Sequence, residues 1–249
     1  SETLPYVFIE VVFMKKFLSV ILCLATLFSF AVPCFAAEES VQQPVIIDTV
    51  FPTDDVVIAD IIATESPYNA DNTGENDATS AIQKAIDDCF ENGGGTVWLP
   101  KGEYRVTGNI YIQKFVTLRG EYQDPDIGTD YGTVIIADVE SSNDMRPSLF
   151  TVGASAGAVG LTVWYPEQDI NNVKPYPYTF YIDGSVDGML HTIKDCTLIN
   201  SYRGIGVGAE CEFGIKQVHE MTTIENVKGT CLYEGLNNTN SSDVDTIKT

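Results

Sequence analysis

Apolar residues recur at intervals of three and four positions over residues 81–90. The positions are Ala81, Ile82, Ala85, Ile86, Cys89 and Phe90. Such spacing places them in one stripe along an amphipathic helix, with the polar residues outside it. Asp77 is typical of a residue that caps a helix start, and Gly93-Gly94-Gly95 of a helix end. The pattern therefore predicts a packing helix over residues 77–92 whose acidic side chains face water.

After the three glycines the chain changes to short runs that are rich in β-branched and aromatic residues, with turns between them. These runs cover residues 96–100, 103–106, 110–118, 133–137, 149–152, 159–165, 178–182, 190–199, 205–207, 221–227 and 244–247. We expect each run to be a strand, and no second helix of comparable length. Upstream, the apolar run over residues 54–62 predicts a strand or strand pair, whereas residues 65–77 contain Pro, Asn and Gly and predict a loop.

Several of the runs can be superposed as repeats of one unit. Leu161–Tyr165 superposes on Cys196–Asn200 with an offset of 35 residues, and Cys196–Asn200 superposes on Thr222–Asn226 with an offset of 26. Irregular offsets above about 20 residues are typical of a solenoid with loops of variable length. Asn200 and Asn226 would then occupy equivalent bends and hydrogen-bond one above the other.

A β-sandwich is the competing architecture. Its adjacent antiparallel strands require tight hairpin turns, for which Asn-Gly and Asp-Gly are the strongest signals. Asp183-Gly184 and Asp187-Gly188 are the only Asp-Gly pairs in the chain. The sequence therefore favours the solenoid.

The N-terminal region has the features of a secretory signal peptide. Met14 is followed by two lysines, an apolar run over residues 17–32 and the exit Pro33-Cys34-Phe35-Ala36. Cleavage is expected after Ala36, which predicts a secreted, extracellular protein with no membrane attachment after cleavage. A lipid anchor on Cys34 is the alternative, but Pro33 occupies a position where a small residue is preferred.

These features divide the chain into four parts. Residues 1–13 are expected to be a non-native segment or an upstream leader, residues 14–36 the signal peptide, and residues 37–64 a linker with a first strand. Residues 65–249 then form the N-terminal part of the solenoid domain.

The charge of the chain excludes some partners. It carries 14 basic and 35 acidic residues, a formal net charge of −21. Such a balance argues against nucleic acid and against anionic membrane surfaces. It also disfavours a polyanionic substrate unless calcium or a local patch of Lys and Arg offsets the repulsion.

Four cysteines remain after the predicted cleavage: Cys89, Cys196, Cys211 and Cys231. Their spacing matches no zinc motif, so no metal site is predicted from them. Export permits one or two disulfides, and buried free thiols on the strands are the alternative.

The stretch from Asn72 to Asp87, together with Gly93-Gly94-Gly95-Thr96-Val97-Trp98-Leu99-Pro100-Lys101-Gly102-Glu103-Tyr104, resembles the first segment of the pectate lyase superfamily. More narrowly, it is similar to the rhamnogalacturonase/epimerase-like domain, and the resemblance covers about residues 50–249. It implies an all-β fold, a right-handed parallel β-helix with an N-terminal capping α-helix. Members of this superfamily hydrolyse, eliminate or isomerise sugars in polymers, or serve as phage tail and surface fibres, so the fold alone does not choose a reaction.

The first group of candidate site residues is Trp164-Tyr165-Pro166-Glu167-Gln168-Asp169. Trp164 and Tyr165 offer aromatic faces for sugar stacking, and Gln168 can bind hydroxyl groups. Glu167 and Asp169 are the candidate acids, because hydrolysis requires two carboxyl groups flanking the glycosidic bond. The alternative is that the aromatic rings pack between coil and loop while the acids face water.

The second group is Asn200-Ser201-Tyr202-Arg203-Gly204. Elimination requires a base, and the resemblance implies Lys or Arg in that role, commonly with calcium held by several acids. Arg203 is the base candidate and Tyr202 a sugar-binding candidate. The alternative is a structural role, with Tyr202 covering a loop and Arg203 paired with a nearby acid.

We therefore expect a protein that acts on a plant or microbial polysaccharide or oligosaccharide, with a glycoside hydrolase as the leading prediction. A polysaccharide lyase, for which Ca²⁺ would be the cofactor, is the first alternative. A non-catalytic glycan-binding or fibre protein is the second alternative. The chain ends inside a predicted strand without a terminal cap, which predicts a β-helix truncated at its C-terminus and part of the active site beyond Thr249. The oligomeric state is left open.

Overall fold

The computed structural model describes residues 42–48, 56–122, 128–184, 189–208 and 219–238. The chain divides into two units, residues 1–40 and residues 41–249, and the described residues all lie in the second. The predicted leader and signal peptide lie outside the described residues, as does the predicted strand over residues 244–247. They stay predictions.

The described part contains one long helix, α2 (Thr79–Glu91), and many short strands. The strands before the helix are β1 (Val45–Asp48), β2 (Val56–Ala59), β3 (Ile61–Ile62) and β4 (Thr73–Asp77). Those after it are β5 (Gly95–Leu99), β6 (Gly102–Val106), β7 (Ile110–Ile112), β8 (Val116–Gly120), β9 (Thr133–Ala137), β10 (Phe150–Val152), β11 (Gly157–Val159), β12 (Leu161–Trp164), β13 (Tyr178–Ile182), β14 (Thr192–Val207) and β15 (Thr223–Asn237).

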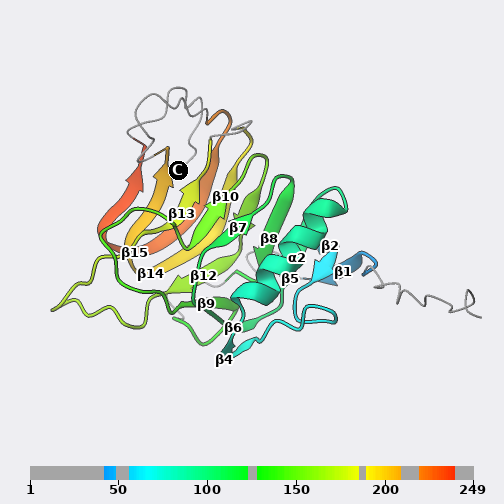
Figure 1. Cartoon of the computed structure of the whole chain (residues 1–249), viewed down its shortest axis with the longest axis horizontal. Helices are drawn as coiled ribbons and strands as arrows, with labels where there is room; N and C mark the ends of the chain where they lie inside the picture. The colour runs from blue at the N-terminus through cyan, green and yellow to red at the C-terminus, as the bar shows by residue number, and fades with distance from the viewer. Residues whose placement is uncertain (1–41, 49–55, 123–127, 185–188, 209–218, 239–249) are drawn as a thin grey trace, which may run out of the picture. The chain divides into compact units, whose positions relative to one another are not determined.

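The strands stack in parallel on three faces, which we number in chain order. Face 1 contains β3, β5, β8, β11 and the first parts of β14 and β15. Face 2 contains β4, β6, β9, β12 and the middle parts of β14 and β15. Face 3 contains β7, β10, β13 and the last parts of β14 and β15. The fold is therefore a right-handed parallel β-helix, as the sequence predicted, and β14 and β15 each form almost a whole coil (Figure 1).

The core is a column of apolar side chains inside the coils. On face 3, Ile110, Phe150, Phe180 and Ile205 occupy the same register position in successive coils, and all are buried. The rings of Phe150 and Phe180 stack with centroids 5.4 Å apart. Burying each such side chain contributes about 1.5–3 kcal/mol, so the repeated register itself stabilises the stack.

Helix α2 lies at the N-terminal end of the stack, against β5, β7 and β8 (Figure 1). It buries Ile82, Ala85, Ile86 and Cys89, which confirms the predicted packing helix. It begins at Thr79, two residues after Asp77, whose carboxylate accepts the Thr79 backbone N–H at 3.0 Å. The assignment of Phe90 to the buried stripe is wrong, because this residue near the last turn is 41% exposed.

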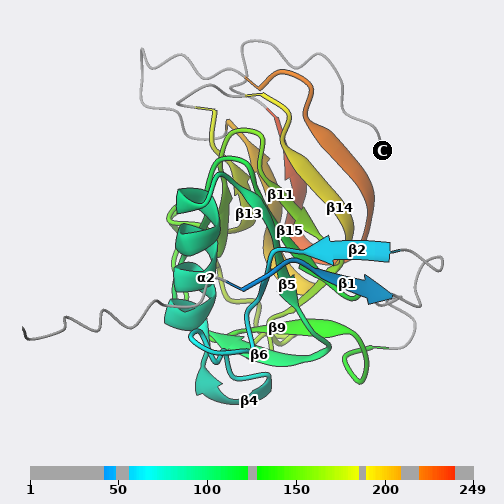
Figure 2. The same ribbon diagram turned by 90° about the vertical axis from the view of Figure 1, so that its right-hand side faces the viewer.

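The strand or strand pair predicted over residues 54–62 is confirmed as two strands, β2 in a hairpin with β1 and β3 in face 1. Strand β2 pairs antiparallel with β1, and Val57 and Ala59 pack with Ile62 and Trp98 in a small separate cluster. Figure 2 shows the β1–β2 hairpin beside β5. The hairpin thus covers Trp98 on the outside of face 1.

Two boundary predictions are wrong. Residues 73–77, predicted as loop, form β4 and pair with β6. The separate strands predicted over residues 190–199 and 205–207 are one strand, β14. Asp195 and Asn200 have left-handed φ values of 51° and 59°, which lets the chain turn a corner within one residue and keep its sheet pairing.

The repeat offsets are partly confirmed. Thr162 pairs with Thr197, which is the predicted offset of 35. The offset of 26 is wrong, because Ile193 pairs with Ile224, 31 residues later. Asn226 consequently lies over Asp195, to which its side-chain amide donates a hydrogen bond at 2.6 Å, rather than over Asn200.

Cys89, Cys196 and Cys231 are free thiols, and Cys211 lies outside the described residues. The alternative of buried thiols on the strands therefore holds for Cys196, which is fully enclosed in the core. Burial raises the pKa of the Cys196 thiol to about 12.

Candidate functional site

The turns that join face 2 to face 3 form one row along the stack, which we call the corner row. In successive coils it contains residues 107–109, 138–148 and 165–177, followed by the corners of β14 and β15 near Arg203 and Glu234. Polar and aromatic side chains gather here because the outer surface of a corner faces no further strand.

Arg203 is the most unusual residue of the corner row. It is only 6% exposed, and its Nη1 donates a hydrogen bond to the Tyr176 carbonyl at 3.0 Å. Its guanidinium lies 4.9 Å from the ring centroid of Tyr202 and 5.3 Å from that of Tyr233. Those two rings stack on each other at 4.9 Å with an interplanar angle of 12°. The predicted pair Tyr202 and Arg203 is therefore joined by a second tyrosine from the next coil.

The guanidinium of Arg203 has no acidic partner in the described part of the chain. No carboxylate there forms an ion pair with it, and its Nε has no hydrogen-bond partner. The alternative interpretation, in which Arg203 pairs with a nearby acid, is wrong for these residues. A buried charge without a counter-charge is costly, so this position favours an anion.

Glu234 in β15 pairs in register with Arg203 in β14, but its carboxylate is hydrogen-bonded to other residues. It accepts a hydrogen bond from the Tyr178 hydroxyl and another from the Asn237 amide at 2.9 Å. The Tyr178 ring lies over Gly206, where an added Cβ would come within 2.9 Å of it. Burial raises the pKa of Tyr178, and the hydrogen bond to Glu234 raises it further. Glu234 thus binds donors of the protein and leaves Arg203 uncompensated.

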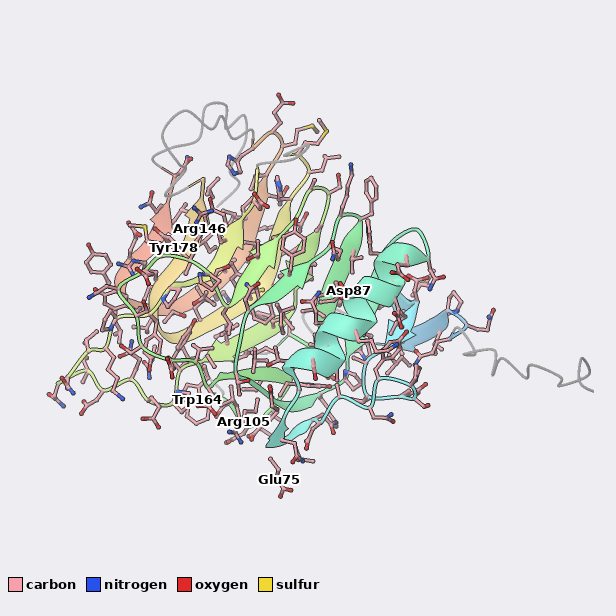
Figure 3. The ribbon with its side chains drawn as sticks, in the orientation of Figure 1. Glu75, Asp87, Arg105, Arg146, Trp164 and Tyr178 are labelled. Atoms are coloured by element: carbon pink, nitrogen blue, oxygen red, sulfur yellow. The ribbon has the colours of Figure 1, made fainter. Side chains whose placement is uncertain are left out.

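The first predicted group is split by the strand itself. Trp164 lies on the outer surface of β12, level with Ile136 and Ile199, and is half-buried (Figure 3). Tyr165 points into the core, is 2% exposed, and places its hydroxyl 3.0 Å from Thr179 Oγ1. Tyr165 follows the end of β12 and is enclosed in the core, so the prediction that both rings stack on sugar is wrong for Tyr165.

The polar members of that group hold their own loop together. Gln168 Nε2 donates to the Lys174 carbonyl at 2.8 Å, and its Oε1 accepts the Lys174 N–H at 3.0 Å. Glu167 forms an exposed ion pair with Lys174 at 3.4 Å. Asp169 accepts the Asn171 N–H at 2.8 Å. The structure does not bring Glu167 and Asp169 together with Tyr202 and Arg203 through any of these contacts.

A cavity of about 380 Å³ lies further along the corner row. It is lined by residues of the 138–148 loop, by Thr107, Gly108 and Asn109, and by Tyr165 and Pro177. The sequence had singled out Tyr165 and the aromatic run 175–178 that contains Tyr178, but not the polar side chains of residues 107–109 and 138–148, nor Tyr233 and Glu234. The correct offset of 31 would have placed Tyr233 beside Tyr202 and Glu234 beside Arg203, because the last two pair in register.

Within the described ranges, no three His, Cys, Asp or Glu side chains gather as metal ligands. Calcium therefore stays a prediction. The same ranges contain no helix that is both long and apolar enough to span a bilayer.

Residues 66–148 match the model of a family described as rhamnogalacturonase A/epimerase, pectate lyase-like. Over these residues the resemblance to the pectate lyase superfamily is confirmed. Among curated proteins, 41 residues are 56% identical to alginate lyase 7 of Azotobacter vinelandii and to its mannuronan C5-epimerase AlgE5. The match covers 16% of this chain, 5% of the lyase and 4% of the epimerase.

Among solved structures, the AlgE4 A-module of the Azotobacter vinelandii mannuronan C-5 epimerase is similar with a TM-score of 0.46 and 20% identity. The similarity covers 71% of this chain and 50% of that one. PfbA, a surface adhesin of Streptococcus pneumoniae, has a TM-score of 0.45 and 19% identity, covering 68% of this chain and 38% of the adhesin. The chain thus spans about half or less of these proteins.

Proposed function

We propose that this chain, whose residues 66–148 match the pectate lyase-like family, is part of a secreted enzyme that modifies an acidic polysaccharide by elimination or epimerisation. The substrate would lie along the corner row, with a sugar carboxylate at Arg203. Secretion rests on the predicted signal peptide over residues 14–36.

The observation that carries this proposal is the buried guanidinium of Arg203, which has no ion pair among the described residues and lies beside the stacked rings of Tyr202 and Tyr233. A guanidinium binds a carboxylate through two parallel hydrogen bonds, and the Nε of Arg203 is buried without a hydrogen-bond partner. Tyr233 is 64% exposed and provides an aromatic surface for a sugar ring. The chain has a net charge of −21, which repels a polyanion, and the positive charge of Arg203 offsets that repulsion locally.

The chemistry follows from the position of the charge. When a guanidinium neutralises a sugar carboxylate, the adjacent C–H becomes more acidic and a base can remove its proton. Loss of the glycosidic oxygen from the next carbon then gives an unsaturated product, whereas return of a proton to the opposite side gives the epimer. Arg203 is held as a donor by the Tyr176 carbonyl, so its role here is to bind the carboxylate rather than to act as the base.

The hydrolase prediction has less support from the described residues. Its two candidate acids, Glu167 and Asp169, bind Lys174 and the Asn171 backbone in one exposed loop. Hydrolysis by a carboxylate pair requires both groups to face one glycosidic bond. Elimination or epimerisation requires a carboxylate-binding cation instead, which the corner row offers.

The test is incubation of the full chain with polygalacturonate, alginate and neutral dextran. We expect binding to the two polyuronates but not to dextran, with ultraviolet absorbance of an unsaturated product or inversion detected by proton NMR. New reducing ends without absorbance would instead establish hydrolysis. Binding to none of the polymers, or to dextran alone, would overturn the proposal.

A further inference from the structure

The 138–148 loop, which we call the arch, is the part of the corner row that lies between the turns 107–109 and 165–177. Ser141 Oγ and the Ser142 N–H donate to the Pro175 carbonyl at 2.8 and 3.0 Å. At its far end, Asn109 Nδ2 donates to the Ser148 carbonyl at 2.6 Å. The arch is therefore fastened to the coil before it and to the coil after it, and the cavity of about 380 Å³ beside it is a built feature.

The cavity has two kinds of wall. Val139, Leu149 and Pro177 provide apolar surface, and Tyr165 also lines the cavity. The polar lining residues are Asn109, Glu140, Asp144 and Arg146. The Asn109 amide already donates to the Ser148 carbonyl and to Thr151 Oγ1, and one Asp144 oxygen accepts from Ser142 Oγ. A sugar ring has the matching character, since its C–H face is apolar and its hydroxyl groups both donate and accept hydrogen bonds.

The charges of the cavity differ from those at Arg203. Two carboxylates, Glu140 and Asp144, accompany one guanidinium, that of Arg146, which lies 5.1 Å over the Tyr181 ring (Figure 3). Two acids disfavour a further carboxylate and accept hydrogen bonds from hydroxyl groups. The cavity therefore suits a neutral, hydroxyl-bearing unit.

A short chain of contacts connects the cavity to Arg203. Tyr165 lines the cavity and packs on Tyr176 with ring centroids 5.1 Å apart, and the Tyr176 carbonyl accepts the hydrogen bond of Arg203. Strand β10 follows the 138–148 loop in the chain and pairs with β13 on face 3. Strand β13 in turn pairs with β14, which contains Arg203. Two strand spacings amount to about 10 Å along the stack, so one oligosaccharide can contact both places.

We propose that this cavity is a second subsite of the same polymer, which takes a neutral sugar unit while Arg203 takes an acidic one. This inference rests on the proposed function and adds to it that the substrate contains both kinds of unit along one chain. It also requires that the polymer runs parallel to the stacking direction of the coils.

The test measures the affinity of the full chain, by titration calorimetry, for two sets of defined oligosaccharides. One set is all-acidic oligogalacturonates from dimer to hexamer, and the other alternates acidic and neutral units over the same lengths. We expect affinity for the alternating set to rise with length by about tenfold or more, and affinity for the all-acidic set to rise less.

Two variants address the cavity itself. Val139→Trp fills it, and Glu140→Gln keeps its size while removing one carboxylate. Both are expected to weaken binding of the alternating hexamer, Val139→Trp by about tenfold and Glu140→Gln by about two- to tenfold, without changing binding of the dimer. Glu91→Gln, the same change on the exposed surface of α2, is the matched control and should change neither.

The outcomes separate the two proposals. If neither set binds at any length, the proposed function fails. The second subsite is wrong if both sets bind with no dependence on length or composition. It is also wrong if folded Glu140→Gln binds the alternating hexamer as the unchanged chain does. In both cases the proposed binding of a sugar carboxylate by Arg203 is unaffected.

Discussion

The loop after Trp164 and the corner at Arg203 both carry the aromatic and charged residues that sugar binding requires, yet they use them differently. In the loop, Gln168, Glu167 and Asp169 find partners within six or seven positions along the chain. At the corner, Tyr176, Arg203 and Tyr233 come from three successive coils. A loop satisfies its own polar groups locally, whereas the corner built by stacking holds a buried guanidinium without an ion pair among the described residues.

Lowering the pH is expected to have the largest effect, and it should destabilise the coils that carry the corner rather than the loop. His191 and His219 are buried beside each other, with ring centroids 5.9 Å apart, before the two coils that carry the corner. Burial, and then the neighbouring His219, lowers the pKa of His191 to about 4, and burial also lowers the pKa of His219. The fold therefore holds both histidines neutral.

The sign of the pH dependence follows from these shifts. Stability is fully present above the ordinary histidine pKa of about 6.5 and is lost as the pH falls toward 4, by on the order of 3 kcal/mol for His191. Urea unfolding at pH 7.5, 5.5 and 4.5, together with hydrogen exchange, checks this. Exchange should rise in β14 and β15 before it rises in β12. A flat response, or one that His191→Gln does not reduce, contradicts the prediction.

Replacement of Arg203 gives the largest expected effect on binding. Arg203→Ala removes charge-assisted hydrogen bonds worth about 1.5–3 kcal/mol, which corresponds to a loss of roughly 10- to 150-fold in affinity for a polyuronate. Arg203→Lys keeps the charge but lacks the planar guanidinium, so its affinity should lie between those of the unchanged chain and Arg203→Ala. Calorimetric titration measures both. Unchanged affinity of a folded Arg203→Ala variant would remove the corner from the site.

Tyr233 gives an intermediate effect. Tyr233→Ala removes the exposed member of the stacked pair and its contact with the guanidinium, together worth about 0.5–1.5 kcal/mol, or a loss of about two- to tenfold in affinity. Tyr233→Phe keeps the ring and should bind as the unchanged chain does. If both variants lose affinity equally, the hydroxyl rather than the aromatic face makes the contact.

The smallest effects are expected in the loop. Glu167→Gln removes an exposed ion pair whose contribution is about 0–1 kcal/mol, and Asp169→Asn keeps an oxygen for the Asn171 N–H. Neither should change turnover of a polyuronate by more than about twofold. Loss of activity by about a hundredfold in either variant would restore the hydrolase prediction. The loop, rather than the corner at Arg203, would then be the more important region for activity.

Much of the candidate site could not be predicted because it depends on register. Tyr202 and Arg203 stood out as a local group, but Glu234 and Tyr233 become their neighbours only when β14 and β15 pair with an offset of 31 residues. A superposition of apolar runs suggested 26 instead. Apolar runs resemble one another at several offsets, whereas strand pairing is fixed by where the chain turns at residues such as Asp195.

The sequence by itself determined the capping helix, the strand-rich coils and the parallel β-helix, because periodicity and glycine positions act locally and repeat along the chain. It also identified both groups of candidate residues. Only the tertiary structure decided that Tyr165 faces the core, that Glu167 and Asp169 serve their own loop, and that Arg203 is buried without an acid. Side-chain direction, burial and charge compensation are properties of several coils at once, so they exist only after the coils have stacked.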